Sequence, residues 1–449
     1  MIDLKDKTIL ILGLGASGYA AAEFLLKKNS RVKISENGDS SEIRADIDKL
    51  ERSGRIEHET GGHTGKFCSK TDMIVASPGV DVRKLYSSGL LPRDIPLIGT
   101  LELGANYCRA PIIAVTGTNG KSTVTELTGH ILSSSGRDVT VCGNIGNPLI
   151  GEIDSLGENS VAVVEVSSFQ LETIKKFRPH IAVLLNITAD HYDRHNDHEG
   201  YKTEKYKIFM NQTDNDWAVI NSNLKNDPEI KDIKSHTIFF GEDGDMAKVS
   251  GNEIVLSDRE KEGTFSIGEE VLPVSGGHNL ENVACSALVA GLMGIDKSVT
   301  REAITTFKPL KHRTENIGCF GGIEFIDDSK ATNIDATRRA VETVNKKLVL
   351  IVGGRDKGGD YSSLLPLVKE KVKTMIVLGE AKKKIANVFD RIVPVIETDD
   401  MGFAVKKAVE KAEYGDVVML SPMCSSFDMF SGYKERGEAF QREVKKQVS

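Results

Sequence analysis

The 449-residue sequence has few cysteines, no large excess of charge and no long hydrophobic run. Its six cysteines are scattered without a C-x-x-C pair, which favours free thiols in a reducing cytoplasm over a disulfide framework or a zinc site. The formal net charge of −7 gives no sign of a nucleic-acid or membrane surface. No run approaches the roughly 20 apolar residues of a membrane span. We therefore expect a cytoplasmic protein that binds neither nucleic acid nor a membrane.

The length is too great for one ordinary hydrophobic core. At roughly 100–200 residues per domain, two to four domains are expected. Hydrophobic residues make up 39% and charged residues 27%, which is typical of a globular protein. Residues 1–24 contain a short apolar run followed by glycines, which predicts a first β-strand and turn and not a signal peptide.

Three segments open with an apolar strand that runs into a glycine turn, namely residues 7–18, 111–132 and 346–360. The strand-like runs TMIVLGE, RIVPVIE and DVVMLSP follow the third. This alternation is the βαβ rhythm of parallel α/β sheets. Turn-rich or charged stretches before the second and third segments predict domain boundaries, which gives domains 1–107, 108–311 and 312–449.

The clearest motif is a phosphate-type loop between a strand and a helix. It comprises Gly117, Thr118, Asn119, Gly120, Lys121, Ser122 and Thr123. Glycines permit a tight loop whose N–H groups face an anion, and the following helix presents its positive end. Lys121 would reach the terminal phosphates, and the Ser122 or Thr123 hydroxyl would hold Mg²⁺. Val115 stands where the standard P-loop has its first glycine, and a simple glycine turn is the alternative.

A second glycine loop, Gly13-x-Gly15-x-x-Gly18, begins the chain, and Glu36 follows at the distance of an acid that binds a ribose. A dinucleotide site is the first interpretation, and a purely structural turn is the alternative. Two nucleotide loops in one chain suggest a third possibility. One loop would take ATP, and the other would hold the phosphates of a nucleotide-tagged substrate.

Acidic, histidine and lysine side chains follow the central strands. Glu165 ends a buried-type strand, the usual place of a Mg²⁺ ligand, although a helix-capping acid is the alternative. His191, His195 and His198 suggest zinc, but no cysteine is near, so we interpret His191, expected at a strand end, as a magnesium-site residue. A predicted helix follows whose composition does not single out one lysine among Lys202, Lys205 and Lys207.

The last third of the chain offers three more charged candidates. Arg313 could neutralise phosphate charge, and Asp328 and Lys330 could meet a nucleotide from the far side. Surface ion pairs are an equally good interpretation of all three from the residues alone.

The motifs GTNGKST, EVSSFQLE, NITADHYDRH, HNLENVACS, HRTE, DDSKATN and SPMCSSFDMF occur in this order along the chain. Together they resemble the Mur ligase family, the ATP-dependent amino-acid ligases of peptidoglycan precursor synthesis. The GLGASG start, Ser77-Pro78-Gly79 and the SPxxxSxDxF string resemble members that add D-glutamate to UDP-N-acetylmuramoyl-L-alanine through an acyl phosphate. The resemblance implies a monomeric three-domain α/β protein. Its parts would be a Rossmann-like N-terminal domain, a central P-loop-type ATPase domain and a Rossmann-like C-terminal domain.

The resemblance also implies roles for individual residues. UDP-substrate contacts would be Gly15, Ala16, Ser17, Glu36, Asn37, Ser77 and Asn144, although the family often has an acidic-Thr-Arg string where Glu36-Asn37-Gly38 stands. The catalytic residues would be Lys121, Glu165, His191 and Lys205. ATP contacts would be the loop 117–123 with Asn279, Arg313, Asp328 and Lys330. D-Glutamate contacts would be Thr332, Lys357, Ser426, Phe427 and Tyr433, where the family usually has Phe at the last position.

The cofactors implied are ATP and two Mg²⁺ ions. Their ligands would be Ser122, Thr123, Glu165, His191 and Lys205. The family carries the matching lysine as a carbamate, which turns a cation into an anion that can hold Mg²⁺.

Other functions remain to be separated. Another Mur-type ligase or a folylpolyglutamate-type ligase would share the ATP loop. A nicotinamide-dependent dehydrogenase would explain only the first 100 residues. A module that only binds a ligand would not explain why one chain has three phosphate-type elements.

Overall fold

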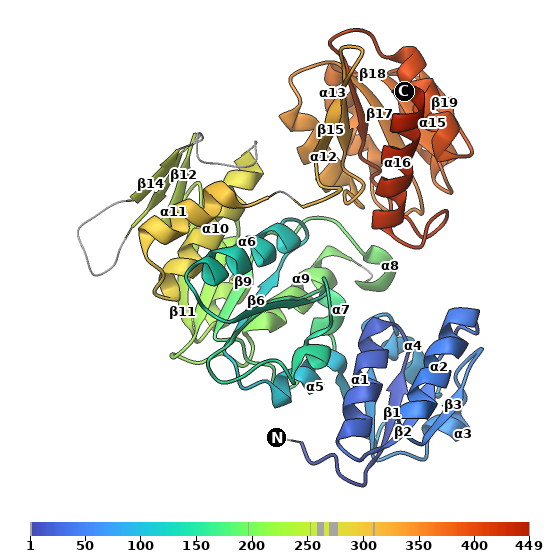
Figure 1. The fold of residues 1–449 in the computed structure, drawn as a ribbon, viewed down its shortest axis with the longest axis vertical. Helices are drawn as coiled ribbons and strands as arrows, with labels where there is room; N and C mark the ends of the chain where they lie inside the picture. Colours follow the sequence, from blue (N-terminus) through green and yellow to red (C-terminus); the bar gives the residue numbers. More distant parts are fainter. Residues whose placement is uncertain are drawn as a thin grey trace. The chain divides into compact units, whose positions relative to one another are not determined.

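The computed structural model describes residues 2–195, 197–251, 253–257, 265–268, 277–308 and 310–448. The chain forms two compact units. The first contains Met1–Asn186, Lys202–Leu272 and Leu280–Thr306, and the second contains Ile187–Tyr201, Pro273–Asn279 and Phe307–Ser449. Three β-sheets organise these units, and Figure 1 labels the helices beside each. Among the helices of the described residues, none is both long and apolar enough to cross a bilayer.

The first sheet, blue in Figure 1, is parallel and has the order β3-β2-β1-β4-β5. Its strands are β1 (Thr8–Leu12), β2 (Arg31–Ser35), β3 (Ile56–Glu59), β4 (Met73–Ala76) and β5 (Leu97–Gly99). Its helices are α1 (Ala16–Lys27), α2 (Ser41–Ser53), α3 (Gly65–Cys68), α4 (Val82–Ser87) and α5 (Thr100–Tyr107). Ile9 and Ile11 pack into one apolar core and Leu10 and Leu12 into another, as expected of a strand buried on both faces. The strand order reverses at β1, with β2 and β3 on one side and β4 and β5 on the other, so a ligand crevice is expected where β1 and β4 end.

The second sheet has the order β14-β13-β12-β11-β10-β9-β6-β8-β7. Its strands are β6 (Ile112–Thr116), β7 (Val139–Gly143), β8 (Val161–Glu165), β9 (Ile181–Leu184), β10 (Trp217–Asn221), β11 (His236–Gly241), β12 (Ala247–Ser250), β13 (Glu253–Leu256) and β14 (Phe265–Gly268). Strands β6 to β12 pair in parallel with their neighbours, whereas β13 pairs antiparallel with β12 and β14.

The helices of this region include α6 (Lys121–Ser134), α7 (Ser168–Leu171), α8 (Tyr192–His195), α9 (His198–Tyr206), α10 (Gly277–Leu292) and α11 (Lys297–Thr306). Short 3₁₀ turns are η1 (Leu149–Glu152), η2 (Lys207–Phe209), η3 (Ser222–Leu224) and η4 (Pro228–Asp232). Strand β9 ends at Leu184, so the expectation that His191 stands at a strand end was wrong. His191 lies in the loop before α8, with a left-handed backbone (φ 56°).

The third sheet has the order β15-β16-β20-β17-β18-β19. Its strands are β15 (Glu315–Phe320), β16 (Ile323–Asp327), β17 (Leu348–Gly353), β18 (Val372–Leu378), β19 (Val395–Glu397) and β20 (Val417–Leu420). Its helical segments are α12 (Ile334–Thr343), η6 (Tyr361–Leu364), α13 (Leu365–Lys371), α14 (Lys382–Phe389), α15 (Met401–Lys411) and α16 (Tyr433–Val448). Only the β15–β16 pair is antiparallel among the described pairings of this sheet.

The predicted strand–turn–helix segments are confirmed. β1, β6 and β17 each end in a glycine turn, and α1 and α6 begin directly after the first two turns. Because parallel strands end at one edge of a sheet, the loops after β1 and β4, after β6 and β8, and after β16, β17 and β20 form three such edges. The predicted site residues lie mainly in these loops.

Candidate active site

The phosphate-type loop after β6 requires its glycines. Gly117 and Gly120 have φ of 155° and 88°, and a Cβ at Gly117 would lie 2.9 Å from Leu185 Cβ. Asn186 fixes the loop from the neighbouring strand end. Its Oδ1 accepts the Asn119 N–H at 2.8 Å, and its Nδ2 donates to the Asn119 carbonyl at 3.0 Å. Sequence reasoning missed Asn186, although its place after the apolar run IAVLL was a signal.

Two lysine amines converge on one carbonyl of this loop. The Lys121 Nζ donates to the carbonyls of Gly117 and Thr118, both at 2.8 Å. The Lys205 Nζ, on α9, also donates to the Gly117 carbonyl at 2.8 Å, and Lys205 is only 1% exposed. The loop in this state therefore holds both cations close to the α6 N-terminus, where an anion is favoured.

The neighbouring lysines on this segment are engaged elsewhere. Lys202 pairs with Asp227 and Glu229 at 3.2 and 3.0 Å. Lys207 pairs with Glu204 at 2.7 Å. The structure therefore separates Lys205 from the other two lysines, which composition could not do.

Glu165 ends β8 beside the phosphate loop. It pairs in register with Val115 of β6 and with Gly143 of β7. Its Oε1 accepts a hydrogen bond from Asn144 Nδ2 at 2.8 Å. Gly143 has no space for a side chain, since a Cβ there would lie 2.3 Å from the Glu165 carbonyl oxygen. This close approach places Asn144 against the carboxylate.

Two buried side-chain oxygens of this region stand out by their hydrogen bonding. Glu165 Oε2 and Thr123 Oγ1 are both buried, and neither has a hydrogen-bond partner among the described residues. Ser122, the other predicted hydroxyl, is 4% exposed. Oxygen ligands of this kind suit Mg²⁺, so the residues present fit the implied ion. Burial, followed by the Glu165 charge, raises the pKa of the nearby Glu126 carboxyl.

The glycine loop after β1 is tied to the loop after β4. Ser77 Oγ donates to the Gly13 carbonyl at 2.7 Å. A Cβ at Gly18 would lie 1.9 Å from that same carbonyl oxygen, so α1 packs tightly against the turn. The Glu36 carboxylate accepts the N–H groups of Leu14 and Gly38 at 2.5 and 2.7 Å.

The other predicted substrate-binding residues of this loop lie at or near the surface. Gly15 is the N-cap of α1, and Ala16 and Ser17 begin this helix. Gly15, Ala16 and Asn37 are exposed. The free α1 N-terminus and the exposed turn can therefore accept an anionic group.

In the second unit, a strained loop presents Arg313. Both flanking residues, His312 and Thr314, have left-handed backbones with φ of 61° and 45°. His312 Nδ1 lies 2.7 Å from Asp327 Oδ2, which anchors the loop to the end of β16. Strained non-glycine residues of this kind persist where the surroundings impose them.

Asp328 and Lys330 follow on the same side of β16. Asp328 accepts hydrogen bonds from the Ser421 hydroxyl at 2.7 Å and the Thr314 N–H at 3.1 Å. Burial raises the pKa of Asp328 to about 7, against the lowering effects of the Ser421 hydrogen bond and the Arg313 charge. The Lys330 Nζ lies 4.1 Å from the centroid of the Tyr433 ring.

Lys357 meets the segment that carries His191. The Lys357 Nζ lies 3.3 Å from Asp190 Oδ1, and Asn333 Nδ2 donates to Asp190 Oδ2 at 3.0 Å. His191 Nε2 is 3.6 Å from Asp190 Oδ2. The structure therefore brings predicted glutamate and metal residues of the second unit together around Asp190, which sequence reasoning did not single out.

The remaining predicted residues differ in exposure. Ser426 is 2% exposed and Phe427 is 64% exposed, although they are neighbours in the loop after β20. Thr332 and Tyr433 are partly buried, and Asn279 lies partly buried in the first turn of α10.

The three histidines that suggested zinc do not form a metal cluster. His195 stacks on Tyr201 with ring centroids 5.4 Å apart, and the His198 ring faces the Tyr192 hydroxyl at 3.3 Å. Across the described part of the chain, one group has the geometry of three metal ligands, namely His312, Glu315 and Asp327. Hydrogen bonds already join these three groups to one another and to Gln441.

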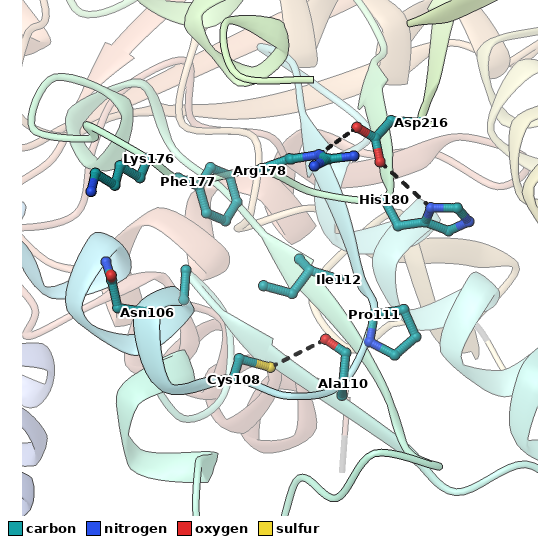
Figure 2. A pocket seen from close by; sticks show the side chains of 11 residues that line it. Asn106, Cys108, Ala110, Pro111, Ile112, Lys176, Phe177, Arg178, His180 and Asp216 are labelled. Carbon is teal, nitrogen blue, oxygen red and sulfur yellow. Dashed lines mark hydrogen bonds and ion pairs between the residues drawn. The ribbon is translucent and has the colours of Figure 1, made fainter. Parts of the chain in front are cut away.

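A pocket of about 350 Å³ lies at the other edge of the second sheet (Figure 2). Ile112 begins β6 there, and His180 and Asp216 directly precede β9 and β10. Arg178 Nε binds Asp216 Oδ2 at 2.7 Å, and the His180 ring lies 3.6 Å from the other oxygen. None of the predicted site residues is among the residues described as lining it.

Family models match all three regions of the chain. A "Mur ligase MurD-like, N-terminal domain" matches residues 7–99, a "Mur ligase middle domain" residues 115–290, and a "Mur ligase, glutamate ligase domain" residues 312–424.

Curated relatives match along the full length. A UDP-N-acetylmuramoylalanine–D-glutamate ligase of Koribacter versatilis is 39% identical over 99% of this chain and 98% of its own. The corresponding ligase of Desulfosudis oleivorans is 40% identical over 99% and 97%.

Solved structures share the fold at lower identity. MurC from Thermotoga maritima has a TM-score of 0.60 at 19% identity and covers 98% of this chain and 100% of its own. MurF from the same organism, in complex with ADP, has a TM-score of 0.61 at 18% identity with both chains fully covered. The three sheets, the phosphate-type loop and these full-length matches together establish that the chain belongs to the Mur ligase family.

Proposed function

We propose that this chain is an ATP-dependent ligase that adds D-glutamate to UDP-N-acetylmuramoyl-L-alanine in peptidoglycan precursor synthesis. The observation that carries this function is the full-length similarity to ligases of that name, at 39–40% identity. The geometry supports it, because three features lie at one sheet edge: the phosphate-type loop, two converging lysines, and the buried Glu165 Oε2, which has no hydrogen-bond partner among the described residues.

The reaction needs a leaving group on a carboxylate. The muramoyl-alanine carboxylate attacks the γ-phosphorus of ATP, so that ADP leaves and an acyl phosphate forms. The neutral amine of glutamate then attacks the acyl carbon, phosphate leaves, and the nitrogen loses a proton. Lys121 and Arg313 would offset the charge that repels the attacking carboxylate from the phosphates.

Magnesium fits the buried oxygens of the phosphate loop. We propose that Thr123, Ser122 and Glu165 hold one ion, and that His191 and Lys205 serve a second. A bound Mg²⁺ neutralises phosphate charge and orients the transferred group. Asn144 fixes the Glu165 carboxylate so that Oε2 is free for this purpose.

Lys205 is proposed to work as a carbamate. Its amine is buried and donates a hydrogen bond to the Gly117 carbonyl. An ammonium group has no lone pair, so it cannot serve as a metal ligand. The neutral amine would attack CO₂ and lose a proton, which gives a carbamate whose two oxygens share one negative charge at the same place.

The remaining roles are proposed on the motifs and their positions. ATP would contact Gly117, Thr118, Asn119, Gly120, Asn279, Arg313, Asp328 and Lys330. D-Glutamate would contact Thr332, Lys357, Ser426, Phe427 and Tyr433. The UDP substrate would contact Gly15, Ala16, Ser17, Glu36, Asn37, Ser77 and Asn144. We propose functional domains 1–107, 108–311 and 312–449 for the UDP substrate, ATP and the amino acid, in a chain that acts as a monomer.

Phosphate release tests the function directly. The chain is incubated with ATP, Mg²⁺ and UDP-N-acetylmuramoyl-L-alanine, and D-glutamate, L-glutamate, D-alanine or L-alanine is added in turn. Release that depends on D-glutamate supports the proposal. Release that depends equally on L-glutamate, or that needs a folate in place of the UDP substrate, would contradict it.

A further inference from the structure

Arg436, on α16, is a buried cation at the carboxyl edge of the third sheet. It is 2% exposed. Its Nε donates to Ser329 Oγ at 3.1 Å, and its Nη2 donates to the Ser329 carbonyl at 2.9 Å. Both Nη atoms donate to the Cys424 carbonyl at 3.1 Å, and Nη1 also reaches the Gly353 carbonyl at 3.4 Å. The guanidinium thus donates hydrogen bonds to three separate segments of the chain.

These three segments are the loops that carry residues proposed to bind ATP or D-glutamate. Ser329 precedes Lys330 after β16, Gly353 begins the turn that carries Lys357 after β17, and Cys424 lies two residues before Ser426 after β20. Arg436 is therefore shared by the ATP-side loop and both amino-acid loops.

The loops leave little freedom around this side chain. The backbones of Arg355 and Ser425 join the second and third loops by hydrogen bonds of 2.9 and 3.2 Å. A Cβ at Gly354 would lie 3.1 Å from Arg436 Nη1 and 2.2 Å from the Ser425 carbonyl oxygen. Met423, directly before Cys424, has a left-handed backbone with φ of 62°. The double hydrogen bond to the Cys424 carbonyl helps to hold this strained turn.

The charge of Arg436 has only neutral hydrogen-bond acceptors. Within the described chain, no carboxylate forms an ion pair with it, and all its acceptors are carbonyls or a hydroxyl. Burial lowers the pKa of Arg436 to about 10, against the raising effects of the nearby Cys424, Asp428, Asp327 and Asp328 side chains, so the group is still protonated at neutral pH. Burying a cation costs desolvation free energy unless hydrogen bonds or an opposite charge compensate it. An anion that binds nearby would offset part of that cost.

We infer that Arg436 is a positioning residue for the amino-acid half of the site. It holds the three loops in one arrangement, and its charge attracts the carboxylates of an anionic amino acid to Lys357 and Ser426. The inference rests on the proposed function for the identity of the amino acid.

A matched control exists in the same sheet. Lys371, at the end of α13, also donates only to carbonyls, namely those of Val341 at 3.3 Å and of Glu342 and Val344 at 2.8 Å. It lies directly before β18, at the opposite edge from the loops. Its loss should reduce stability without changing ligand binding.

The experiment compares Arg436→Lys, Ser329→Ala and Lys371→Met in the full chain. Steady-state kinetics are measured with each substrate varied in turn, beside thermal unfolding. Lysine keeps the charge but lacks the planar fork of donors, so Arg436→Lys should raise the D-glutamate KM about tenfold or more and lower kcat. Ser329→Ala, the milder change, should raise it roughly two- to fivefold. Both should leave the KM for the UDP substrate within about twofold, and Lys371→Met should leave all three KM values within that range.

Three outcomes separate the claims. An active wild type with these specific KM changes supports the inference. An active wild type in which Arg436→Lys and Ser329→Ala match Lys371→Met, or change all three KM values equally, would overturn it and leave the proposed function intact. A folded wild type without D-glutamate-dependent turnover would overturn the proposed function and, with it, the inference.

Discussion

Asp328 makes the second unit sensitive to pH in a direction opposite to that of most carboxylates. The raised pKa of about 7 means that the folded protein keeps the Asp328 proton at pH values where the unfolded chain has lost it. Asp328→Asn removes this ionisation and keeps the shape of the side chain. The amide oxygen can still accept the Thr314 N–H, and the Ser421 hydroxyl can accept from the amide nitrogen.

The size of the effect follows from the pKa difference. The folded value of about 7 exceeds the ordinary 3.8 by about three units. Each unit corresponds to about 1.4 kcal/mol, so the penalty for ionised Asp328 reaches about 4 kcal/mol. It is absent below about pH 4, grows between about pH 4 and pH 7, and is constant above that. Asp328→Asn should therefore gain stability relative to the wild type as the pH rises through this window.

The assay is thermal unfolding of both proteins between about pH 4.5 and pH 8. Asp335→Asn is the control. Although burial opposes it, Arg339 and Arg338 hold the pKa of Asp335 below its ordinary value. That stabilising contribution is present above the unfolded pKa and is lost as the pH falls through the folded pKa, so Asp335→Asn should be less stable than the wild type at neutral pH. A constant difference between Asp328→Asn and the wild type across the range would refute the reasoning.

Three further changes test the site and its support. Lys205→Ala should lower turnover by about 100-fold or more with partial rescue by formate, whereas Lys207→Ala should stay active; full activity of Lys205→Ala would exclude the carbamate. Lys357→Ala should raise the D-glutamate KM about tenfold or more with the ATP KM little changed, and an equal rise in Lys384→Ala would remove the claim of specificity. Glu102, 1% exposed, accepts the N–H groups of residues 175–177, each at 2.9 Å. Glu102→Gln should cost about 1–3 kcal/mol in denaturant unfolding, because at least one buried N–H loses its acceptor, and an unchanged midpoint would contradict this.

The sequence predicted what local pattern determines. The strands ending at Thr116 and Glu165 and the helix starting at Lys121 lie where apolar runs, glycines and polar residues indicate. The antiparallel strands β12 to β14 were not predicted, since short apolar runs carry little information about pairing. The strand expected near His191 ends at Leu184, because the polar residues that follow belong to a loop.

The sequence could not identify residues whose partners are distant along the chain. Lys205 reaches a carbonyl 88 positions away, and Arg436 reaches one 107 positions away. A lysine or arginine on a polar helix face has the same local pattern whether it is solvated or buried. Only the packing of the sheets distinguishes the two cases.

The dependence of three loops on Arg436 has a consequence for biosynthesis. The ribosome releases α16 after every strand and loop that Arg436 contacts. The nascent C-terminal sheet can pair its strands before that helix exists, but its loops remain without their common donor. The ligand-binding edge should therefore mature last, at the time when α16 docks, and resistance of these loops to proteolysis should appear later than that of the strands.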